Sequence, residues 1–357
     1  MAQADPEADP RLERLYADFA AGDLAPLWTV RDDLMPSEPK PRAVPHLWRW
    51  QQLLPLAERA GRLVPVGRGG ERRAIALANP GLRPEPYATA TLWAAIQYLG
   101  PLETAPTHRH SQSAFRFVVE GEGVWTVVDG DPVAMRRGDV LLTPGRAFHG
   151  HHNVRSAPMC WLDGLDIPLL STLDATFFEL GDDGVAERAI PARSRSERLW
   201  GRPGLRPLGV DTTRPASTLV AYRWEHTDAA LAEQLAVGNE SDVGPVGPGH
   251  AAVRFTDVRT GADALATIRL EMHRMVAGSD IRPERRVGSS VWQVFDGEGV
   301  VSLDGDDRAV GRGDVFVVPS WCPMAVRPTT DMDLFTFSDA PVMEKLGLDR
   351  RPAQGPR

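Results

Sequence analysis

The sequence predicts an all-β protein with two similar antiparallel barrels of the jelly-roll type and short helices at their periphery. Short apolar runs alternate with glycine-containing turns, as in residues 115–119, the turn at 121–123 and the run at 124–128. This alternation is typical of antiparallel strands. The same series of strands and turns returns near the C-terminus, which indicates an internal duplication. A chain of 357 residues is long enough for two domains of ordinary size.

Two pairs of matched segments carry the repeat. Residues 121–131 read GEGVWTVVDGD and residues 297–306 read GEGVVSLDGD, while residues 137–144 read RGDVLLTP and residues 312–319 read RGDVFVVP. The Asp-Gly pairs are typical of tight hairpins. We therefore expect an N-terminal extension packing on the barrels, a first barrel, a linker with peripheral strands, and a second barrel with the C-terminal tail, over residues 1–90, 91–180, 181–264 and 265–357.

Composition and charge exclude several kinds of partner. The net charge is −8 at pH 7 and no basic patch stands out, so we expect neither nucleic acid nor a membrane as a partner. No run approaches the 18 apolar residues of a transmembrane helix. The first ten residues lack the charged start and apolar stretch of a secretory signal. Two cysteines in so long a chain favour a reducing compartment, which predicts the cytoplasm.

Segments outside the repeat have patterns of their own. Residues 28–55 are rich in proline and tryptophan, and we expect them to wrap over a barrel without a core of their own. Residues 73–79 predict a strand, and a short helix is expected near residues 228–235. Four residues recur at helical spacing after Pro10 and predict a short amphipathic helix, namely Leu12, Leu15, Tyr16 and Phe19.

Five of the nine histidines lie in two short clusters. In a β-strand, residues i and i+2 point to the same face, so His108 and His110 can reach one ion inside the barrel. His149 follows 39 residues after His110, and a neighbouring antiparallel strand can bring it opposite that pair. Imidazole suits iron, copper, nickel and zinc. Three imidazoles on one face of an octahedral ion leave three positions open, two for a chelating substrate and one for dioxygen.

Two further histidines follow the third candidate ligand. His151 is two residues from His149, which places it on the same face of a strand, and it is the better candidate for an acid or base near the metal. Either His151 or His152 can instead be a solvated loop histidine.

The second copy of the repeat lacks the candidate ligands. Counting from the matched turns and strand ends gives the residues in their places: Glu284 for His108, Arg286 for His110 and Met324 for His149. A guanidinium there would repel a cation. We therefore expect the second barrel to hold no metal and to serve packing and assembly.

These residues resemble the motifs of the cupin superfamily. The first motif is matched by His108, His110 and Gly121, and the second by residues 138–144, His149 and Asn153. Most cupins also carry a glutamate in the first motif, where this chain has Ala114. That difference argues against a site of three histidines and one carboxylate.

The sequence is similar instead to the gentisate 1,2-dioxygenase family of bicupins, which includes enzymes that cleave the rings of salicylate and 1-hydroxy-2-naphthoate. The likeness covers most of the chain and is strongest at residues 107–117, 149–153, 161–168 and 337–341. It implies iron(II), dioxygen, an aromatic hydroxy-acid substrate and a homotetramer. For gentisate (2,5-dihydroxybenzoate), opening the bond between C1 and C2 would give maleylpyruvate.

The resemblance also implies roles for individual residues. The iron ligands would be His108, His110 and His149, and the residues around substrate and oxygen would be Gln97, Arg116, His151 and Asp163. Trp93 lies in a matching strand, and Arg72-Arg73 match the region of a carboxylate-binding arginine, for which we prefer Arg72. Arg146-Ala147 stand where the family often has an aromatic residue, which can alter the mouth of the pocket.

Arg116 has a second argument in its favour. An arginine offers a planar fork for a carboxylate. Arg116 lies six residues beyond His110, and an even offset keeps the same face of a strand if no bulge intervenes. The alternatives are a structural ion pair for Arg116, a turn position for Asp163 and a backbone hydrogen bond for Gln97.

Four functions stay open on the sequence. The leading one is iron(II)-dependent cleavage of gentisate by dioxygen, and the next is the same reaction on salicylate, a substituted salicylate or 1-hydroxy-2-naphthoate. The third is a metal-dependent isomerase or an oxygen-independent lyase. The fourth is a non-catalytic cupin that binds a sugar or a small acid. Oxygen consumption on adding a hydroxybenzoate separates the first two from the others.

Overall fold

The structure, a computed structural model, describes residues 9–66, 73–181, 191–210, 218–240 and 246–349. The chain divides into two compact units, Met1–Lys40 and Pro41–Arg357. The first unit holds the helices α1 (Pro10–Ala21) and α2 (Leu27–Leu34), and neither has a buried residue. Phe19 of α1 packs edge-on against Trp28 of α2, with ring centroids 6.0 Å apart. The predicted amphipathic helix after Pro10 is therefore confirmed.

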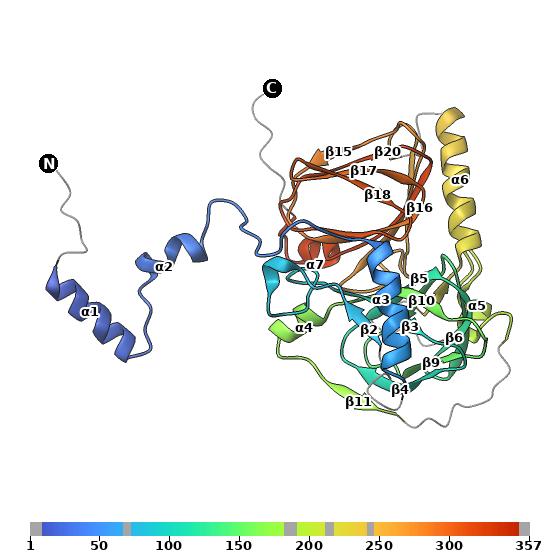
Figure 1. The fold of residues 1–357 in the computed structure, drawn as a ribbon, viewed down its shortest axis with the longest axis horizontal. Helices are drawn as coiled ribbons and strands as arrows, with labels where there is room; N and C mark the ends of the chain where they lie inside the picture. The colour runs from blue at the N-terminus through green and yellow to red at the C-terminus, as the bar shows by residue number, and fades with distance from the viewer. Residues whose placement is uncertain (1–8, 67–72, 182–190, 211–217, 241–245, 350–357) are drawn as a thin grey trace. The chain divides into compact units, whose positions relative to one another are not determined.

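The second unit contains two barrels, and short helices accompany them (Figure 1). The strands of the first barrel are β2 (Ala74–Ala76), β3 (Trp93–Leu99), β4 (Thr104–His110), β5 (Ala114–Glu120), β6 (Glu122–Val128), β7 (Asp131–Arg136), β8 (Val140–Thr143), β9 (His149–Asn153), β10 (Met159–Leu165), β11 (Phe178–Leu180) and β12 (Ala221–Tyr222). Those of the second barrel are β1 (His46–Trp48), β13 (His250–Arg254), β14 (Arg269–Met275), β15 (Ile281–Glu284), β16 (Ser290–Asp296), β17 (Glu298–Leu303), β18 (Asp306–Gly311), β19 (Val315–Val318), β20 (Met324–Pro328) and β21 (Met332–Ser338). The remaining helices are α3 (Trp50–Leu63), the 3₁₀ turn η3 (Pro80–Leu82), α4 (Ile167–Thr172), α5 (Arg195–Trp200), α6 (Trp224–Glu240) and α7 (Ala340–Lys345).

Each barrel is a pair of facing antiparallel sheets. In the first barrel the strand orders are β12-β8-β5-β10-β3-β2 and β11-β4-β9-β6-β7, and in the second they are β1-β19-β16-β21-β14-β13 and β15-β20-β17-β18. The inner strands repeat one order, since β8-β5-β10-β3 corresponds to β19-β16-β21-β14. The structure therefore confirms the predicted all-β fold with two jelly-roll barrels.

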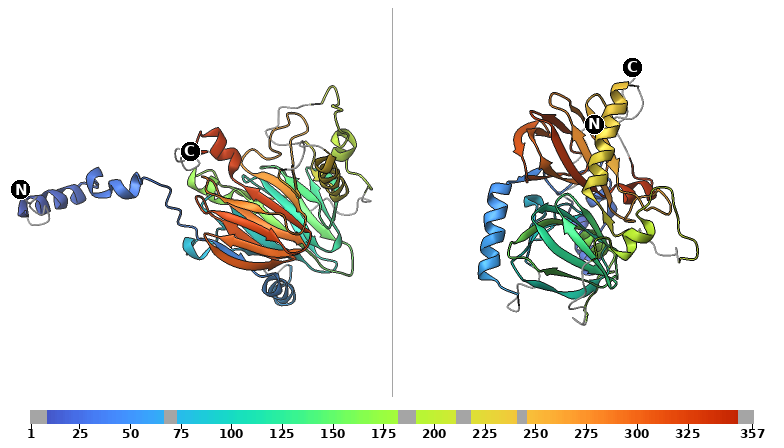
Figure 2. Two further views of the ribbon diagram at one scale, coloured as in Figure 1. Left: turned by 90° about the horizontal axis from the view of Figure 1, so that it is seen from above. Right: turned by 90° about the vertical axis from the view of Figure 1, so that its right-hand side faces the viewer.

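The two six-stranded sheets pack against each other, so the barrels lie side by side (Figure 2). Strand β5 shows how this works, because successive side chains point to opposite faces. Phe115 and Phe117 point toward the second barrel, where Phe117 stacks on Phe335 with ring centroids 4.1 Å apart. Val118 belongs to the core inside the first barrel, and Arg116 points to the same interior. Both faces of β5 are buried, which explains why its residues are apolar on both faces apart from Arg116.

The helices differ most from expectation. Residues 28–55 do not simply wrap over a barrel: they contain most of α2, strand β1 and the start of α3, in which Pro55 lies. Proline removes a helix hydrogen bond, but buried contacts of Leu53 and Ala57 hold α3 on the molecule. Helix α6 starts at Trp224, earlier than the expected residues 228–235, and runs to Glu240. The predicted strand at 73–79 is shorter, over Ala74–Ala76.

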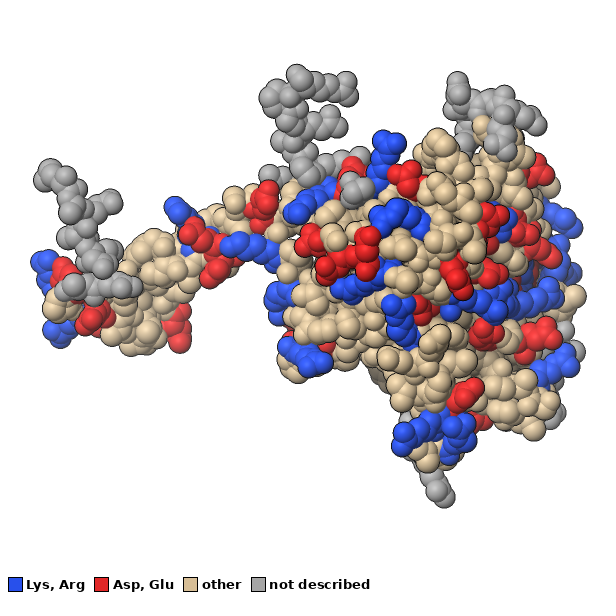
Figure 3. All heavy atoms as spheres, turned by 45° about the horizontal axis from the view of Figure 1, so that its top comes forward, with Lys and Arg blue, Asp and Glu red and all other residues tan. Residues whose placement is uncertain are grey.

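Charged side chains of both signs are interspersed on the face of the molecule in Figure 3. Some charged residues form ion pairs across neighbouring strands, as Arg274 of β14 does with its direct partner Asp333 of β21. Among the described residues, no helix combines the length and apolar character needed to cross a membrane.

Candidate metal centre and active site

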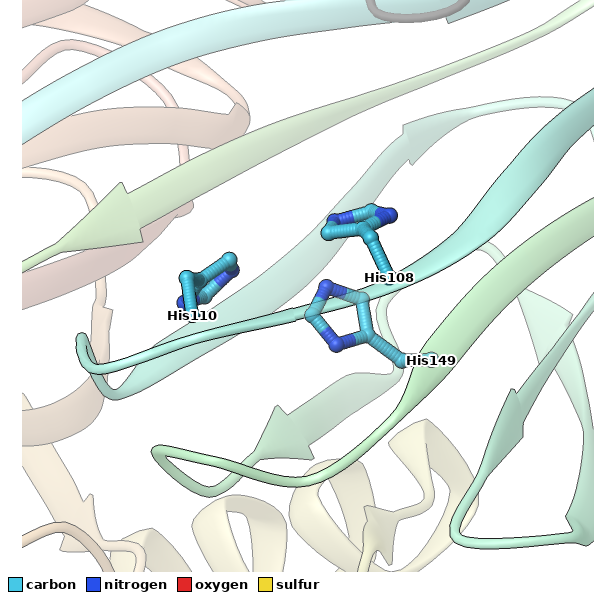
Figure 4. Close-up of side chains that lie close together, drawn as sticks. All are labelled: His108, His110 and His149. Atoms are coloured by element: carbon cyan, nitrogen blue, oxygen red, sulfur yellow. The ribbon is translucent and has the colours of Figure 1, made fainter. Parts of the chain in front are cut away.

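Three histidines meet inside the first barrel (Figure 4). His108 and His110 lie two residues apart on β4, and His149 is the first residue of β9, directly opposite His108 in the antiparallel register. All three side chains are buried, and one ring nitrogen of each lies within 4.8 Å of the others. The predicted meeting of His149 with the His108/His110 pair across neighbouring strands is confirmed.

The orientation of the three rings suits a metal ion. Each Nδ1 lies within hydrogen-bonding distance of a main-chain carbonyl oxygen: 2.8 Å for His108 and Pro106, 3.0 Å for His110 and Gln112, and 3.0 Å for His149 and Ala147. When Nδ1–H donates to a carbonyl, Nε2 keeps its lone pair for a metal. Nε2 of His149 is buried and has no hydrogen-bond partner among the described residues.

The charge state of His149 fits the same role. Burial, with the nearby Arg116, His108 and His110, lowers the pKa of His149 well below its ordinary value, so the ring is neutral. Neutral imidazole is the form that binds metal ions. Ala114, at the position where many cupins carry glutamate, lines the cavity without offering a ligand atom. The protein therefore presents a site of three imidazoles.

The histidines open into a cavity of about 720 Å³. This volume lies in the range of small-molecule sites. Its lining comprises Ala74, Trp93, Gln97, Ala105, His108, His110, Gln112, Ala114, Arg116, His149, His151, Asp163, Leu165, Ile167, Ser171, Thr176, Phe177 and Phe178. The residues singled out from the sequence as Gln97, Trp93, Arg116, His151 and Asp163 all lie on this wall.

The family resemblance implies a carboxylate-binding arginine at Arg72 or Arg73. Arg72 lies outside the described residues. Its neighbour Arg73 does not line the cavity: its guanidinium pairs with Glu103 and donates to the carbonyl oxygen of Val64 at 3.0 Å. Arg73 thus fastens the end of α3 to the first barrel.

Arg116 reaches the cavity by a different route from the one expected. The even offset from His110 assumed one continuous strand, and that assumption is wrong. His110 ends β4 in one sheet and Arg116 belongs to β5 in the facing sheet, with Ser111–Ser113 as the connection. Both side chains point inward because the two sheets enclose the same interior.

Arg116 and Asp163 form a buried pair on neighbouring strands. They are direct cross-strand partners of β5 and β10, and Nε of Arg116 lies 3.6 Å from Oδ1 of Asp163. Arg116 also donates through Nη1 to the hydroxyl of Thr143. Burial raises the pKa of Asp163 to about 6, although Arg116 and the indole N–H of Trp161 oppose the rise. Burial likewise lowers the pKa of Arg116, and Asp163 opposes that change.

His151 and His152 point to opposite faces of β9. His151 is buried on the cavity wall, with its ring centroid 5.2 Å from that of Trp161. His152 stacks on Trp125, with centroids 4.3 Å apart, and does not line the cavity. The preference for His151 as the residue near the metal therefore agrees with the geometry.

Sequence reasoning missed the far wall of the cavity. Thr176, Phe177 and Phe178 come from the segment that leads into β11, which pairs with β4 beside the histidines. The Phe178 ring stacks on His108, with centroids 5.5 Å apart and planes at 28°. The signal was two adjacent phenylalanines beyond the last strand of the barrel, but no periodicity showed where that segment returns.

The second barrel repeats the geometry without the ligands. Glu284 of β15 lies opposite Met324 of β20, as His108 lies opposite His149. The alignment of the two copies by sequence is therefore confirmed at these positions. Neither Glu284 nor Met324 offers an imidazole.

The comparisons with known proteins agree with this site. The cupin domain family matches residues 95–165. A gentisate 1,2-dioxygenase from Streptomyces sp. is 62% identical over 339 residues, covering 95% of this chain and 94% of the relative. A 5-aminosalicylate 1,2-dioxygenase from Comamonas sp. is 34% identical, covering 96% and 90%. The crystal structure of salicylate 1,2-dioxygenase from Pseudoaminobacter salicylatoxidans with gentisate has a TM-score of 0.95 at 55% identity, covering 99% of this chain and 98% of that one.

Fold and site together define a bicupin with a three-histidine metal-binding site in its first barrel. The chain belongs to the gentisate 1,2-dioxygenase family and is a ring-cleaving dioxygenase.

Proposed function

We propose that the protein uses iron(II), held by His108, His110 and His149, to cleave gentisate with dioxygen to maleylpyruvate. Both oxygen atoms enter the product, and the bond between C1 and C2 of the ring breaks. The observation that carries the proposal is the buried group of three imidazoles, in a cavity that also holds a buried arginine. Among the described residues, Nε2 of His149 has no hydrogen-bond partner. The choice of gentisate is supported by the name of a relative that is similar over almost the whole chain.

Iron(II) bound at this site would bring the hydroxy acid and dioxygen together and pass electron density from ring to oxygen. The chain's own residues do the rest. Arg116 offers a planar pair of N–H donors for the substrate carboxylate, and Arg72 is the second candidate for that task. Leu165, Ile167 and Phe178 keep water away from the reacting ring.

Three polar residues and one aromatic complete the proposed site. Asp163, with its pKa raised to about 6, can accept a proton from a substrate hydroxyl near neutral pH. His151 provides a second acid or base, and Gln97 a hydrogen bond to substrate or oxygen. Trp93 contributes an apolar wall to the cavity. All four lie on strands of the barrel, which favours a rigid arrangement.

The same site supports a second candidate substrate. Relatives that act on 5-aminosalicylate and 1-hydroxy-2-naphthoate are 34% and 33% identical, and a salicylate dioxygenase shares the fold at 55% identity. A salicylate, a substituted salicylate or 1-hydroxy-2-naphthoate is therefore the alternative. A homotetramer in the cytoplasm belongs to the same proposal, supported by the family likeness and the two free thiols.

A panel assay tests the proposal. Iron-loaded protein, prepared anaerobically, is mixed with oxygenated buffer and gentisate, salicylate, 5-aminosalicylate or 1-hydroxy-2-naphthoate. We expect oxygen uptake and a product two oxygen atoms heavier than the substrate, with the highest kcat/KM for gentisate. A higher kcat/KM for another acid would show that this acid, and not gentisate, is the preferred substrate. Absence of oxygen uptake with every acid would leave an isomerase, a lyase or a binding protein instead.

A further inference from the structure

We infer that Thr143 and Trp161 are positioning residues for the ring-cleavage reaction. Together they hold Arg116 and Asp163 next to each other without a direct hydrogen bond between the guanidinium Nε and the carboxylate. The inference rests on the proposed function and names residues that act through Arg116 rather than on the substrate. Neither Thr143 nor Trp161 lines the cavity. Both are completely buried behind it.

Each positioning residue makes a hydrogen bond to one member of the Arg116–Asp163 pair. Trp161 lies two residues before Asp163 on β10, so both side chains share a face, and its indole N–H donates to Oδ1 of Asp163 at 3.0 Å. Thr143 lies at the end of β8, two residues beyond the direct cross-strand partner of Arg116, and its hydroxyl accepts from Nη1. The pair is thus held from both sides by groups of the barrel.

In this arrangement the guanidinium of Arg116 does not use all of its N–H donors. Nε of Arg116 is buried and makes no hydrogen bond among the described residues, and it stands 3.6 Å from Oδ1 of Asp163. A free arginine and carboxylate prefer two parallel hydrogen bonds. Here the indole N–H already takes Oδ1, and the threonine hydroxyl fixes the direction of Nη1. Arg116 therefore stays charged and available to an incoming carboxylate.

The second barrel supplies an internal comparison. In its matched register, Val318 stands for Thr143, Trp292 for Arg116, Leu334 for Trp161 and Thr336 for Asp163. All four members of the network are replaced in the barrel that also lacks the histidines. A jelly-roll barrel of this chain therefore folds without the network, which argues for a role in the reaction.

Removing either positioning residue should let Arg116 close onto Asp163. Thr143→Val matches the residue of the second barrel and removes only the acceptor. Trp161→Phe removes the indole N–H. With wild-type iron content, we expect KM for gentisate to rise roughly tenfold or more in each variant, as for loss of one charge-assisted hydrogen bond, with a smaller change in kcat. Thr143→Ser keeps the hydroxyl and should restore KM.

The chain offers a matched control for the tryptophan. Trp292 of the second barrel is also buried, and its indole N–H donates to Oγ of Ser290 at 2.8 Å, again two residues away on the same strand. Trp292→Phe loses an equivalent hydrogen bond and should leave KM and kcat unchanged. If Trp292→Phe raises KM as much as Trp161→Phe does, the rise is a general packing effect and the positioning role of Trp161 is wrong.

A binding measurement separates this inference from the proposed reaction. The Kd for gentisate is measured on iron-loaded protein without oxygen for the wild type, Thr143→Val, Thr143→Ser and Trp161→Phe. Weaker binding by Thr143→Val and Trp161→Phe, but not by Thr143→Ser, supports positioning even if the wild type consumes no oxygen, in which case only the proposed reaction fails. Wild-type Kd and KM in both Thr143→Val and Trp161→Phe overturn the inference while the reaction stands. A wild-type protein that neither binds nor oxidises gentisate overturns both.

Discussion

Asp139 and Asp314 occupy the same position of the two barrels, and each accepts the backbone N–H of a tryptophan that begins a helix. Trp224 donates to Asp139 at 3.0 Å, and Trp50 donates to Asp314 at 2.8 Å. A carboxylate there satisfies an N–H at the start of a helix, where no helix carbonyl can. The preceding residues, Arg223 and Arg49, pair with the same two carboxylates.

This relationship ties the barrels together in a reciprocal way. Helix α3 precedes the first barrel in the chain but begins on Asp314 of the second, and its body packs on β3. Helix α6 precedes the second barrel but begins on Asp139 of the first, and its body packs on β13. Strands β1 and β12 extend the sheet of the opposite barrel in the same manner. The duplication thus includes a strand, an Arg-Trp pair and a helix before each barrel.

The two aspartates should contribute unequally to stability. Asp139→Asn leaves the buried Arg223 with one carboxylate, Glu197, and should lower the free energy of unfolding by about 3–5 kcal/mol. Asp314→Asn loses the pair with the half-exposed Arg49 but keeps an oxygen that accepts from the Trp50 N–H, so its loss should be about 0.2–1 kcal/mol. Urea unfolding of both variants measures the difference. Equal losses would contradict the role of burial.

The metal content should be one iron per chain. After anaerobic loading and desalting, metal analysis should find about one equivalent, since only one three-histidine group exists among the described residues. The double variant His108→Ala, His110→Ala should lose the iron. Glu284→Gln, at the matched place in the second barrel, should keep it. Two tightly held ions per chain, or iron retained by the double variant, would show that the site is misassigned.

Replacement of Arg116 should separate charge from geometry. Arg116→Lys keeps the charge but loses the fork, so turnover of the hydroxy acid should fall about 10- to 150-fold while iron stays bound, as for one charge-assisted hydrogen bond of roughly 1.5–3 kcal/mol. Arg116→Ala should be worse. Arg137→Lys, outside the cavity, serves as the control. Full turnover and unchanged substrate affinity in both Arg116 variants would make the residue structural and Arg72 the better anchor.

His273 should make the second barrel sensitive to acid. Its Nδ1 lies 3.0 Å from Nε2 of His250, and burial, with His250 and Arg286 nearby, lowers the pKa of His273 to about 3. The unfolded chain has a histidine pKa of about 6.5. The unfolded state therefore binds a proton that the folded state refuses, and stability falls as the pH drops from about 6.5 toward 3. Between pH 7 and pH 4.5 this one group should cost about 2–3 kcal/mol.

The variant His273→Gln tests that cost, since Gln97 fills the matched position of the first barrel. Its loss of stability between pH 7 and pH 4.5 should be smaller than that of the wild type by the same 2–3 kcal/mol. Exposed His226 offers a control, and His226→Gln should lose as much as the wild type. An unchanged acid loss in His273→Gln would mean that other groups govern the response.

Local periodicity and the internal repeat by themselves predicted the two barrels and the three histidines that meet inside the first one. The two-residue spacing of His108 and His110 places both rings on one face of any strand, and the matched turns place Glu284 and Met324 in the second copy. These predictions succeed because strand geometry depends on neighbours in sequence. The prediction for Arg116 reached the right cavity for the wrong reason, since a turn lies between it and His110.

Contacts between distant residues were decided only by the tertiary structure. Nothing near Phe178 in the sequence shows that β11 returns to β4, and nothing near Trp50 shows that its N–H meets Asp314, 264 residues away. The Arg-Trp pairs at 49–50 and 223–224 are visible in the sequence, but a dipeptide carries too little pattern to predict a partner. Trp161 and Thr143 likewise read as ordinary strand residues. Their relation to Arg116 and Asp163 depends on strand register, which is set by the packing of both barrel faces rather than by local sequence.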